Sequence, residues 1–222
     1  LLANRDQPSS LLDITTVFSD DAVLYSLIAG VRDPVLKEYW LGEWANTNSH
    51  TKSEVLGWFR SKFEIFRTQS LVRNVVGQGR STFSFNDVLA NRRILLVNLS
   101  KGMLGEYNSA LIGHVIFARL WMAALERAAL PREERPDFFL FVDEFQNATN
   151  ESLPTVLSEA RKFRVGLTLA NQFFTQVPDA TRDAIMGNVG SRVTLRIGPK
   201  DAQLFTEWLG HDVSSEDLIT LP

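Results

Sequence analysis

The chain has no cysteine, three histidines and no apolar run that reaches the length of a typical membrane span. Without cysteine it can form neither disulfides nor thiolate metal sites, which fits a reducing, cytosolic setting. His50, His114 and His211 are widely spaced and form no H-x-x-x-H pattern, so a zinc site is not expected. The longest apolar run, residues 110–125, contains His114 and Arg119, so we expect a buried helix there and no membrane segment.

Charge of neither sign dominates the composition. The 222 residues carry a formal net charge of −3, with 45% hydrophobic and 22% charged residues, which is ordinary for a globular protein. This balance neither requires nor excludes DNA as a partner, because a motor that holds DNA in a narrow pore needs only a few local cations. The chain starts without methionine or a signal-peptide pattern, and we expect both ends to be cuts from a longer protein.

A phosphate-binding loop of the form G-x-x-x-x-G-K-[ST] does not occur in the sequence. The nearest stretches, residues 77–81 and 101–105, lack its spacing, and Gly102 comes after Lys101 instead of before it. Such a loop supplies the backbone N–H groups that hold the β- and γ-phosphates of a nucleotide. If the chain is part of an NTPase, the loop is expected upstream of residue 1, and the chain alone should not hydrolyse ATP.

The pattern of apolar residues changes near residue 70. Helices are predicted in residues 1–70: one capped at 19–21 and ended by Gly30, one started by Asp33-Pro34, and one started by Thr51 or Ser53 after a polar break at 46–50. This half contains Trp40, Trp44 and Trp58. A small helical core is the expected role of these tryptophans, and stacking on nucleic-acid bases is the alternative.

Residues 71–222 alternate apolar runs of β type with helical stretches. The predicted strands are 94–99, 138–142, 165–170 and 192–197, and the predicted helices are 108–130, 152–163, 179–186 and 199–209, the last closed by Gly210. Continuous apolar runs are typical of strands buried on both faces of a parallel sheet. The predicted fold class is therefore α/β, a mostly parallel sheet flanked by helices, with an N-terminal helical subdomain.

Two acids, Asp143 and Glu144, follow the second predicted strand. The carboxyl ends of the strands form the ligand crevice of an open parallel sheet. There, Asp143 can hold Mg²⁺ through its water shell, and Glu144 can orient and deprotonate an attacking water. This is the Walker B pattern. The alternative is an acidic helix start that is stabilised by the helix dipole.

The next predicted strand ends in Asn171-Gln172, and three cations lie between the two strand tips. Gln172 can donate to a γ-phosphate or position the water; a simple turn is the alternative. The cations Arg161, Lys162 and Arg164 close a helix, which is a favourable place for them whatever the function. An arginine here can also reach a phosphate across a subunit boundary, because the guanidinium is planar, always charged and bidentate.

Residues 72–210 resemble the HerA/FtsK-type ring motors, especially the coupling ATPases of conjugative type IV secretion, the TraG/TraD-like group. The resemblance is carried by residues 73–78, 94–102, 139–147, 158–162 and 169–172. It implies a RecA-like core, a hexameric ring and ATP-driven translocation of DNA. It also implies a cytoplasmic location, at the inner face of the bacterial membrane if a segment outside this chain anchors it, with type IV secretion or relaxosome proteins as partners.

The resemblance also implies roles for individual residues. Asp143 and Glu144 match the Walker B acids, Gln172 matches the polar sensor, and Arg161 matches the arginine finger, while ATP and Mg²⁺ would be the cofactors. Residues 1–70 would correspond to a helical insertion within or beside the motor domain. Two alternatives stay open: a non-catalytic α/β module that recruits a DNA-processing partner, which the missing phosphate loop favours, and a HerA-like translocase of DNA repair or packaging.

Overall fold

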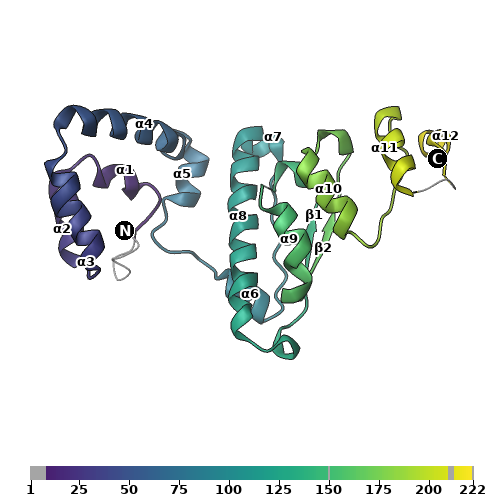
Figure 1. The fold of residues 1–222 in the computed structure, drawn as a ribbon, viewed down its shortest axis with the longest axis horizontal. Helices are drawn as coiled ribbons and strands as arrows, with labels where there is room; N and C mark the ends of the chain where they lie inside the picture. The colour runs from purple at the N-terminus through teal and green to yellow at the C-terminus, as the bar shows by residue number, and fades with distance from the viewer. Residues whose placement is uncertain (1–8, 150, 210–212, 222) are drawn as a thin grey trace. The chain divides into compact units, whose positions relative to one another are not determined.

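The computed structural model describes residues 9–149, 151–209 and 213–221, and the chain divides into two compact units, residues 1–82 and 83–222 (Figure 1). The division lies beyond the boundary expected near residue 70. The reason is that α5 (Ser70–Val76) packs against α4 (Ser49–Thr68) and so belongs to the first unit. Val72 of α5 is fully buried, and the carbonyl oxygen of Val76 accepts a hydrogen bond from the backbone N–H of Leu11.

The first unit is helical, with the three predicted helices in place. Its elements are α1 (Asp13–Val17), α2 (Asp21–Gly30), α3 (Pro34–Glu38) continued by the π-helical η1 (Tyr39–Trp44), α4 and α5. The side chain of Asp20 caps α2 by accepting from the N–H groups of Ala22 and Val23. The start predicted for α4 is wrong, because Asn48 caps it instead and accepts from the N–H of Thr51 at 2.8 Å. Asparagine is among the strongest N-cap residues, so the helix begins at Ser49 and takes in the last two residues of the polar break.

Aromatic side chains form a partly buried cluster in the first unit, whose buried apolar side chains are Leu24, Ile28, Val31 and Val72. The ring of Phe18 lies 5.9 Å from the rings of both Trp40 and Trp44, and 5.1 Å from that of Phe59. Trp40 and Trp44 are partly buried, as expected of a small helical core. Trp58 does not share this core, because 69% of it is exposed. For Trp58, stacking on nucleic-acid bases stays an untested alternative.

The second unit contains a parallel two-stranded sheet flanked by helices. Phe138 pairs with Val165 and Val142 with Leu169 in a continuous register. Its elements are α6 (Phe85–Ala90), α7 (Lys101–Leu104), α8 (Glu106–Glu126), η2 (Arg127–Ala129), η3 (Arg132–Glu134), β1 (Phe138–Val142), η4 (Phe145–Asn147), α9 (Leu153–Glu159), η5 (Ala160–Phe163), β2 (Val165–Leu169), η6 (Phe174–Gln176), α10 (Asp179–Asn188), α11 (Pro199–Leu209) and α12 (Ser215–Thr220). The four predicted helices correspond to α8, α9 with η5, α10 and α11, and Gly210 lies outside the described residues.

The long helix α8 is the core helix of this unit. Within the described residues, α8 and η2 form the one stretch that is long and apolar enough to cross a membrane. Packing in the core explains this apolar composition. Phe117, Leu120, Ala123 and Ala124 of α8 are buried in the core cluster, against which side chains of β1 and α9 also pack. The helix predicted for residues 110–125 is confirmed, but it is buried only on the side that faces the core, since Val115 and Met122 are 44% and 50% exposed.

Two of the four predicted strands are wrong. Residues 94–99 and 192–197 pair with no strand in the described part of the chain, and their apolar side chains are largely exposed. Ile94 and Leu96 are each 89% exposed, and Val193 is 91% exposed. A run of β-branched and aliphatic residues becomes a strand only when its backbone N–H and C=O groups find a neighbouring strand to pair with. Among the residues that the structure describes, neither segment has such a neighbour.

Burial of the strands on both faces is also contradicted. In β1, the side chains of Phe138, Leu140 and Val142 pack against the core, whereas Phe139 and Phe141 are 67% and 72% exposed. The strand β2 alternates in the same way. In the described part of the chain, the helices that pack on the sheet therefore cover one of its faces, and the other face presents apolar side chains to the surroundings.

Candidate active site

The tips of β1 and β2 are joined by backbone hydrogen bonds. The N–H of Ala170 donates to the carbonyl of Val142 at 2.9 Å, and the N–H of Phe145 donates back to Ala170 at 3.1 Å. Asp143 and Glu144 lie between Val142 and Phe145, so both acids sit at this joined tip. The carboxyl ends of parallel strands necessarily share one edge of a sheet, and this edge is where ligands bind in open α/β proteins.

Gln172 lies on the loop that leaves the same edge, two residues after Ala170. Its side chain is exposed and makes no hydrogen bond to another described residue. The loop is anchored from behind by Asp201 of α11, which is 3% exposed and accepts hydrogen bonds from the N–H groups of Phe174 (3.0 Å) and Thr175 (2.9 Å). The predicted sensor therefore projects from a loop whose far end is fixed.

Glu144 is held in an unusual conformation by its neighbours. Its backbone is left-handed, with φ 47° and ψ 47°, which is uncommon for a residue other than glycine and is a feature of functional sites. The next residue, Phe145, is 2% exposed, and its carbonyl accepts from the hydroxyl of Thr149 at 2.7 Å. Nε2 of Gln146 donates to Oε2 of Glu144 at 2.6 Å. A buried anchor and a side-chain hydrogen bond thus fix this carboxylate.

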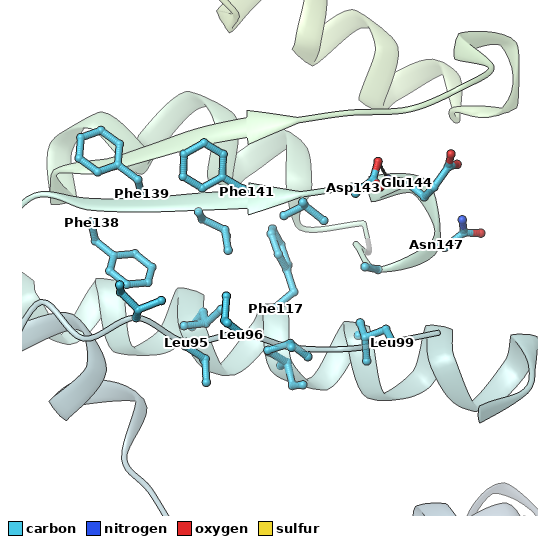
Figure 2. A pocket seen from close by; sticks show the side chains of 18 of the residues that line it. Leu95, Leu96, Leu99, Phe117, Phe138, Phe139, Phe141, Asp143, Glu144 and Asn147 are labelled. Atoms are coloured by element: carbon cyan, nitrogen blue, oxygen red, sulfur yellow. Dashed lines mark hydrogen bonds between the residues drawn. The ribbon is translucent and has the colours of Figure 1, made fainter. Parts of the chain in front are cut away.

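A hollow of about 850 Å³ opens beside the acids. Residues 92–97, α8 and β1 form its walls, which are apolar along most of their length. Figure 2 shows Asp143, Glu144 and Asn147 together at the end of the hollow, beyond the tip of β1. The acids therefore lie at one end of a pocket that is largely apolar, and Arg92, Arg93 and Asp137 are the other charged residues along its walls besides Lys101. A mostly apolar pocket with a few polar groups is typical of a ligand site.

Lys101 also lines this hollow, and the sequence analysis did not assign it to the site. Its Nζ lies 3.1 Å from Oε1 of Glu106 and donates to Oδ1 of Asn147 at 3.3 Å. The sequence did contain a signal for it. Lys101 comes soon after the apolar run 94–99, in the same relation to it that the two acids have to β1.

The structure does not bring Arg161 to the acids within one chain. Arg161 lies in η5, which precedes β2, and the carbonyl of the adjoining Arg164 accepts from the N–H of Phe138 at the start of β1. A five-residue strand spans roughly 16 Å, at about 3.3 Å per residue. Arg161 and Glu144 are therefore at opposite edges of the sheet. In this fold Arg161 has no path to the acids of its own chain.

The three neighbouring cations differ in their partners. Lys162 pairs with Glu159 at 3.1 Å, and Arg164 makes a two-pronged pair with Asp137 at 2.6 and 2.8 Å. The hydrogen bond from Arg164 holds the pKa of Asp137 below its ordinary value, and the same bond raises the pKa of Arg164. Arg161 is exposed and forms no ion pair with another described residue. Of the three, it is the guanidinium that is available to a ligand.

The carboxylate of Asp143 could take part in binding a magnesium ion that is coordinated by the phosphates of a nucleotide. Its side chain is exposed, Oδ1 accepts from the N–H of Glu144 at 3.0 Å, and Oδ2 bonds to no described residue. Nowhere in the described ranges do three or more His, Asp or Glu side chains converge as a metal cluster. Mg²⁺ commonly keeps several waters and takes one or two carboxylates together with substrate phosphates, so a single exposed carboxylate fits that kind of binding.

These residues form a candidate ligand site at the joined tips of two parallel strands, with an amide on the neighbouring loop and Lys101 among the residues that line the hollow. Comparison of the chain with protein-family models, with curated proteins and with solved structures finds no match. A proposal about function therefore rests on the residues and their geometry, because a fold by itself does not specify an activity.

Proposed function

We propose that the chain is part of a RecA-like, ATP-hydrolysing motor of the HerA/FtsK type that translocates DNA, as in conjugative type IV secretion. The observation that carries the proposal is the joined tip of β1 and β2, which presents Asp143 and Glu144 beside the loop of Gln172. Phosphoryl transfer needs little covalent chemistry from the protein and depends on positioning and charge. The resemblance of residues 72–210 to this class of motor supports the same assignment.

Each residue of the site has a role in this proposal. Asp143 would hold Mg²⁺ through water, and the bound ion would neutralise charge on the phosphates. Glu144 would take the proton of the attacking water. One of its oxygens, Oε2, is held by Gln146, while Oε1 accepts no hydrogen bond from a described residue and is free to accept one from a water. Gln172 would bond to the γ-phosphate or to that water.

The position of Arg161 supports assembly into a ring. Because it lies at the edge opposite Glu144, its guanidinium can act only on a nucleotide that another subunit holds. The proposal therefore includes a hexamer in which each subunit supplies Arg161 to its neighbour. DNA would lie in the centre of this ring, and relaxosome or secretion proteins would be its partners. So is a cytoplasmic location at the inner face of the bacterial membrane. Hydrolysis would then depend on assembly.

The substitution Glu144→Gln in the full-length protein tests the proposal. The amide keeps the shape of the side chain but cannot accept the proton, so we expect ATP to bind as in the wild type and hydrolysis to fall by about 100-fold or more. Glu207→Gln, at an exposed position on α11, is the matched control and should leave hydrolysis unchanged. Hydrolysis near the wild-type rate in Glu144→Gln would refute the assignment.

A simpler observation separates the motor from its main alternative. The coding sequence upstream of Leu1 should encode a glycine-rich loop ending in Gly-Lys-Ser or Gly-Lys-Thr if the motor proposal is correct. A start codon immediately before Leu1 would instead favour a non-catalytic module that recruits a DNA-processing partner. The exposed apolar face of β1, with Phe139 and Phe141, is compatible with such recruitment.

A further inference from the structure

A second hollow, of about 550 Å³, opens at the edge of the sheet opposite the acids. Four charged side chains line it: Arg132 from η3, Asp137 from the loop before β1, and Arg161 and Arg164 from the turn before β2. The remaining lining comes from Phe139 and the first residues of β2. Asp137 and Phe139 also line the first hollow, whereas Arg132, Arg161 and Arg164 line only this one.

The charges in this hollow do not cancel. Asp137 and Arg164 neutralise each other through two hydrogen bonds of 2.6 and 2.8 Å. Arg132 and Arg161 are both exposed, and neither makes an ion pair or a side-chain hydrogen bond with another described residue. Two unneutralised guanidinium groups therefore face one hollow, although the chain as a whole has a net charge of −3. We propose that the hollow binds a phosphate-bearing anion between Arg132 and Arg161.

The backbone segments that carry these arginines are tied together before any ligand arrives. Arg135, next to η3, donates from Nη1 to the carbonyl of Lys162 at 2.6 Å and from Nη2 to the carbonyl of Leu130 at 2.7 Å. This link joins η3 to η5, so Arg132 and Arg161 project from segments held at a set spacing. A ligand that bridges them therefore loses less conformational entropy on binding than one that must order the site.

The surroundings favour an anion as the occupant. Arg127 is buried in the same region, and its Nη2 donates to the carbonyl of Pro136. Burial lowers the pKa of Arg127, and the positive charges of Arg135 and Arg164 lower it further. The acids that act on these arginines are Asp137, which Arg164 neutralises, and Glu133, so the cations at this edge of the sheet outnumber the acids. A phosphate suits it because the guanidinium fork matches phosphate oxygens in bidentate hydrogen bonds.

Phosphate could come from a nucleotide held by a neighbouring subunit or from the backbone of DNA. Both would also bring a base, and the exposed ring of Phe139 at the rim of the hollow offers a surface for stacking. Identifying the anion as a neighbour's nucleotide rests on the proposed function. The binding of phosphate between Arg132 and Arg161 does not, because the hollow belongs to a single chain.

The test measures binding of two fluorescent probes to the chain by anisotropy, in the presence of Mg²⁺: an ATP analogue labelled on its ribose, and an oligothymidine labelled at its 5′ end. The variants are Arg132→Gln, Arg161→Gln and the double substitution. Arg32→Gln is the matched control, because Arg32 is exposed in the first unit and its loss changes the net charge by the same amount. Arg132→Lys and Arg161→Lys keep the charge but lose the bidentate fork.

We expect each glutamine substitution to weaken binding by about tenfold, as loss of a charge-assisted hydrogen bond does, and Arg32→Gln to leave it unchanged. Tighter binding of the ATP analogue identifies a nucleotide as the ligand, and tighter binding of the oligonucleotide identifies the DNA backbone. Binding of both probes unaltered in the double variant would overturn the proposal, as would absence of binding to the wild-type chain. The test of the proposed ATPase function, Glu144→Gln, changes a residue at the opposite edge of the sheet. The ATPase proposal and the phosphate-binding proposal can therefore fail independently.

Discussion

The side-chain amide of Gln146 donates a hydrogen bond of 2.6 Å to the carboxylate of Glu144, two residues earlier in the chain. Its own Oε1 is buried and has no hydrogen-bond partner among the described residues. A buried acceptor left unpaired costs about 1–3 kcal/mol. Turning the amide over would place this oxygen against the carboxylate of Glu144, so the contact with Glu144 decides its orientation. Gln146 is therefore a positioning residue for the proposed general base.

Replacing Gln146 with leucine should lower kcat and leave the KM for ATP nearly unchanged. The substitution releases the carboxylate of Glu144 from its held rotamer but does not touch the groups that would bind the nucleotide. We expect a decrease in kcat of about tenfold, since proton transfer by a correctly placed base contributes 100-fold or more. Steady-state kinetics of the full-length protein measure the two constants. An unchanged kcat would show that Glu144 does not depend on Gln146.

Subunit mixing can test whether Arg161 acts across a boundary. Arg161→Ala and Glu144→Gln should each be inactive in a uniform ring, because every interface then lacks one of the two groups. A mixed ring contains interfaces at which the Arg161 of one subunit meets the Glu144 of another, so ATP hydrolysis should partly return. Lys162→Ala is the matched control and should stay active, because Lys162 is paired with Glu159. Mixtures as inactive as the separate variants would argue against the trans role.

Asp201→Asn should loosen the loop that carries Gln172. The buried carboxylate accepts two backbone hydrogen bonds, whereas an asparagine has one acceptor oxygen and would turn an NH₂ group toward one of the donors. We expect the amide hydrogens of Phe174 and Thr175 to exchange faster with solvent by about tenfold or more, because an unmade buried hydrogen bond costs about 1–3 kcal/mol. Hydrogen exchange read by NMR or mass spectrometry resolves this segment.

The control for that experiment is Asp183→Asn, an exposed position on α10, which should leave the exchange of residues 171–176 unchanged. Equal protection of Phe174 and Thr175 in Asp201→Asn and in the wild type would mean that other contacts hold the loop. The stacked pair of Phe174 and Trp208, whose ring centroids lie 6.1 Å apart, would then be the leading candidate.

The pair of Asp137 and Arg164 should make the stability of the second unit depend on pH in acid. The hydrogen bond from Arg164 lowers the pKa of Asp137 below its ordinary value of 3.8. A carboxylate with a lowered pKa in the folded state stabilises that state above its unfolded pKa, and the stabilisation is lost as pH falls through the folded pKa. The free energy of unfolding should therefore decrease as the pH drops below 3.8, in addition to any decrease that other titrating groups cause.

Asp137→Asn removes this ionisation, so the variant should be less stable at neutral pH and lose less stability on acidification. Thermal unfolding monitored by circular dichroism, at a series of pH values above and below 3.8, measures the difference between variant and wild type. Asp183→Asn should retain the wild-type dependence. If Asp137→Asn and the wild type lose stability in parallel through this range, the pair does not contribute to the acid response.

Local signals in the sequence predicted much of the secondary structure. Asp20 begins α2 as the capping rule requires, and the apolar stretch around Phe117 forms the core helix α8. The runs at 138–142 and 165–169 are strands because each finds the other as a neighbour. The runs at 94–99 and 192–197 have similar composition but no partner. Pairing depends on residues far away in the sequence, so composition alone could not separate the two cases.

The sequence by itself determined that Asp143, Glu144 and Gln172 share one edge of a sheet, because consecutive parallel strands place their carboxyl ends together. It could not show which neighbouring side chains complete that edge. Only the tertiary structure brought Lys101 to the wall of the hollow and placed Arg161 at the opposite edge. It also decided that Arg161, and not Arg164, is the arginine without an ion-pair partner among the described residues. Arg164 pairs with Asp137, which is 27 positions away in the sequence. Spacing along a strand is a local property of the backbone, whereas charge pairing follows from how distant segments pack.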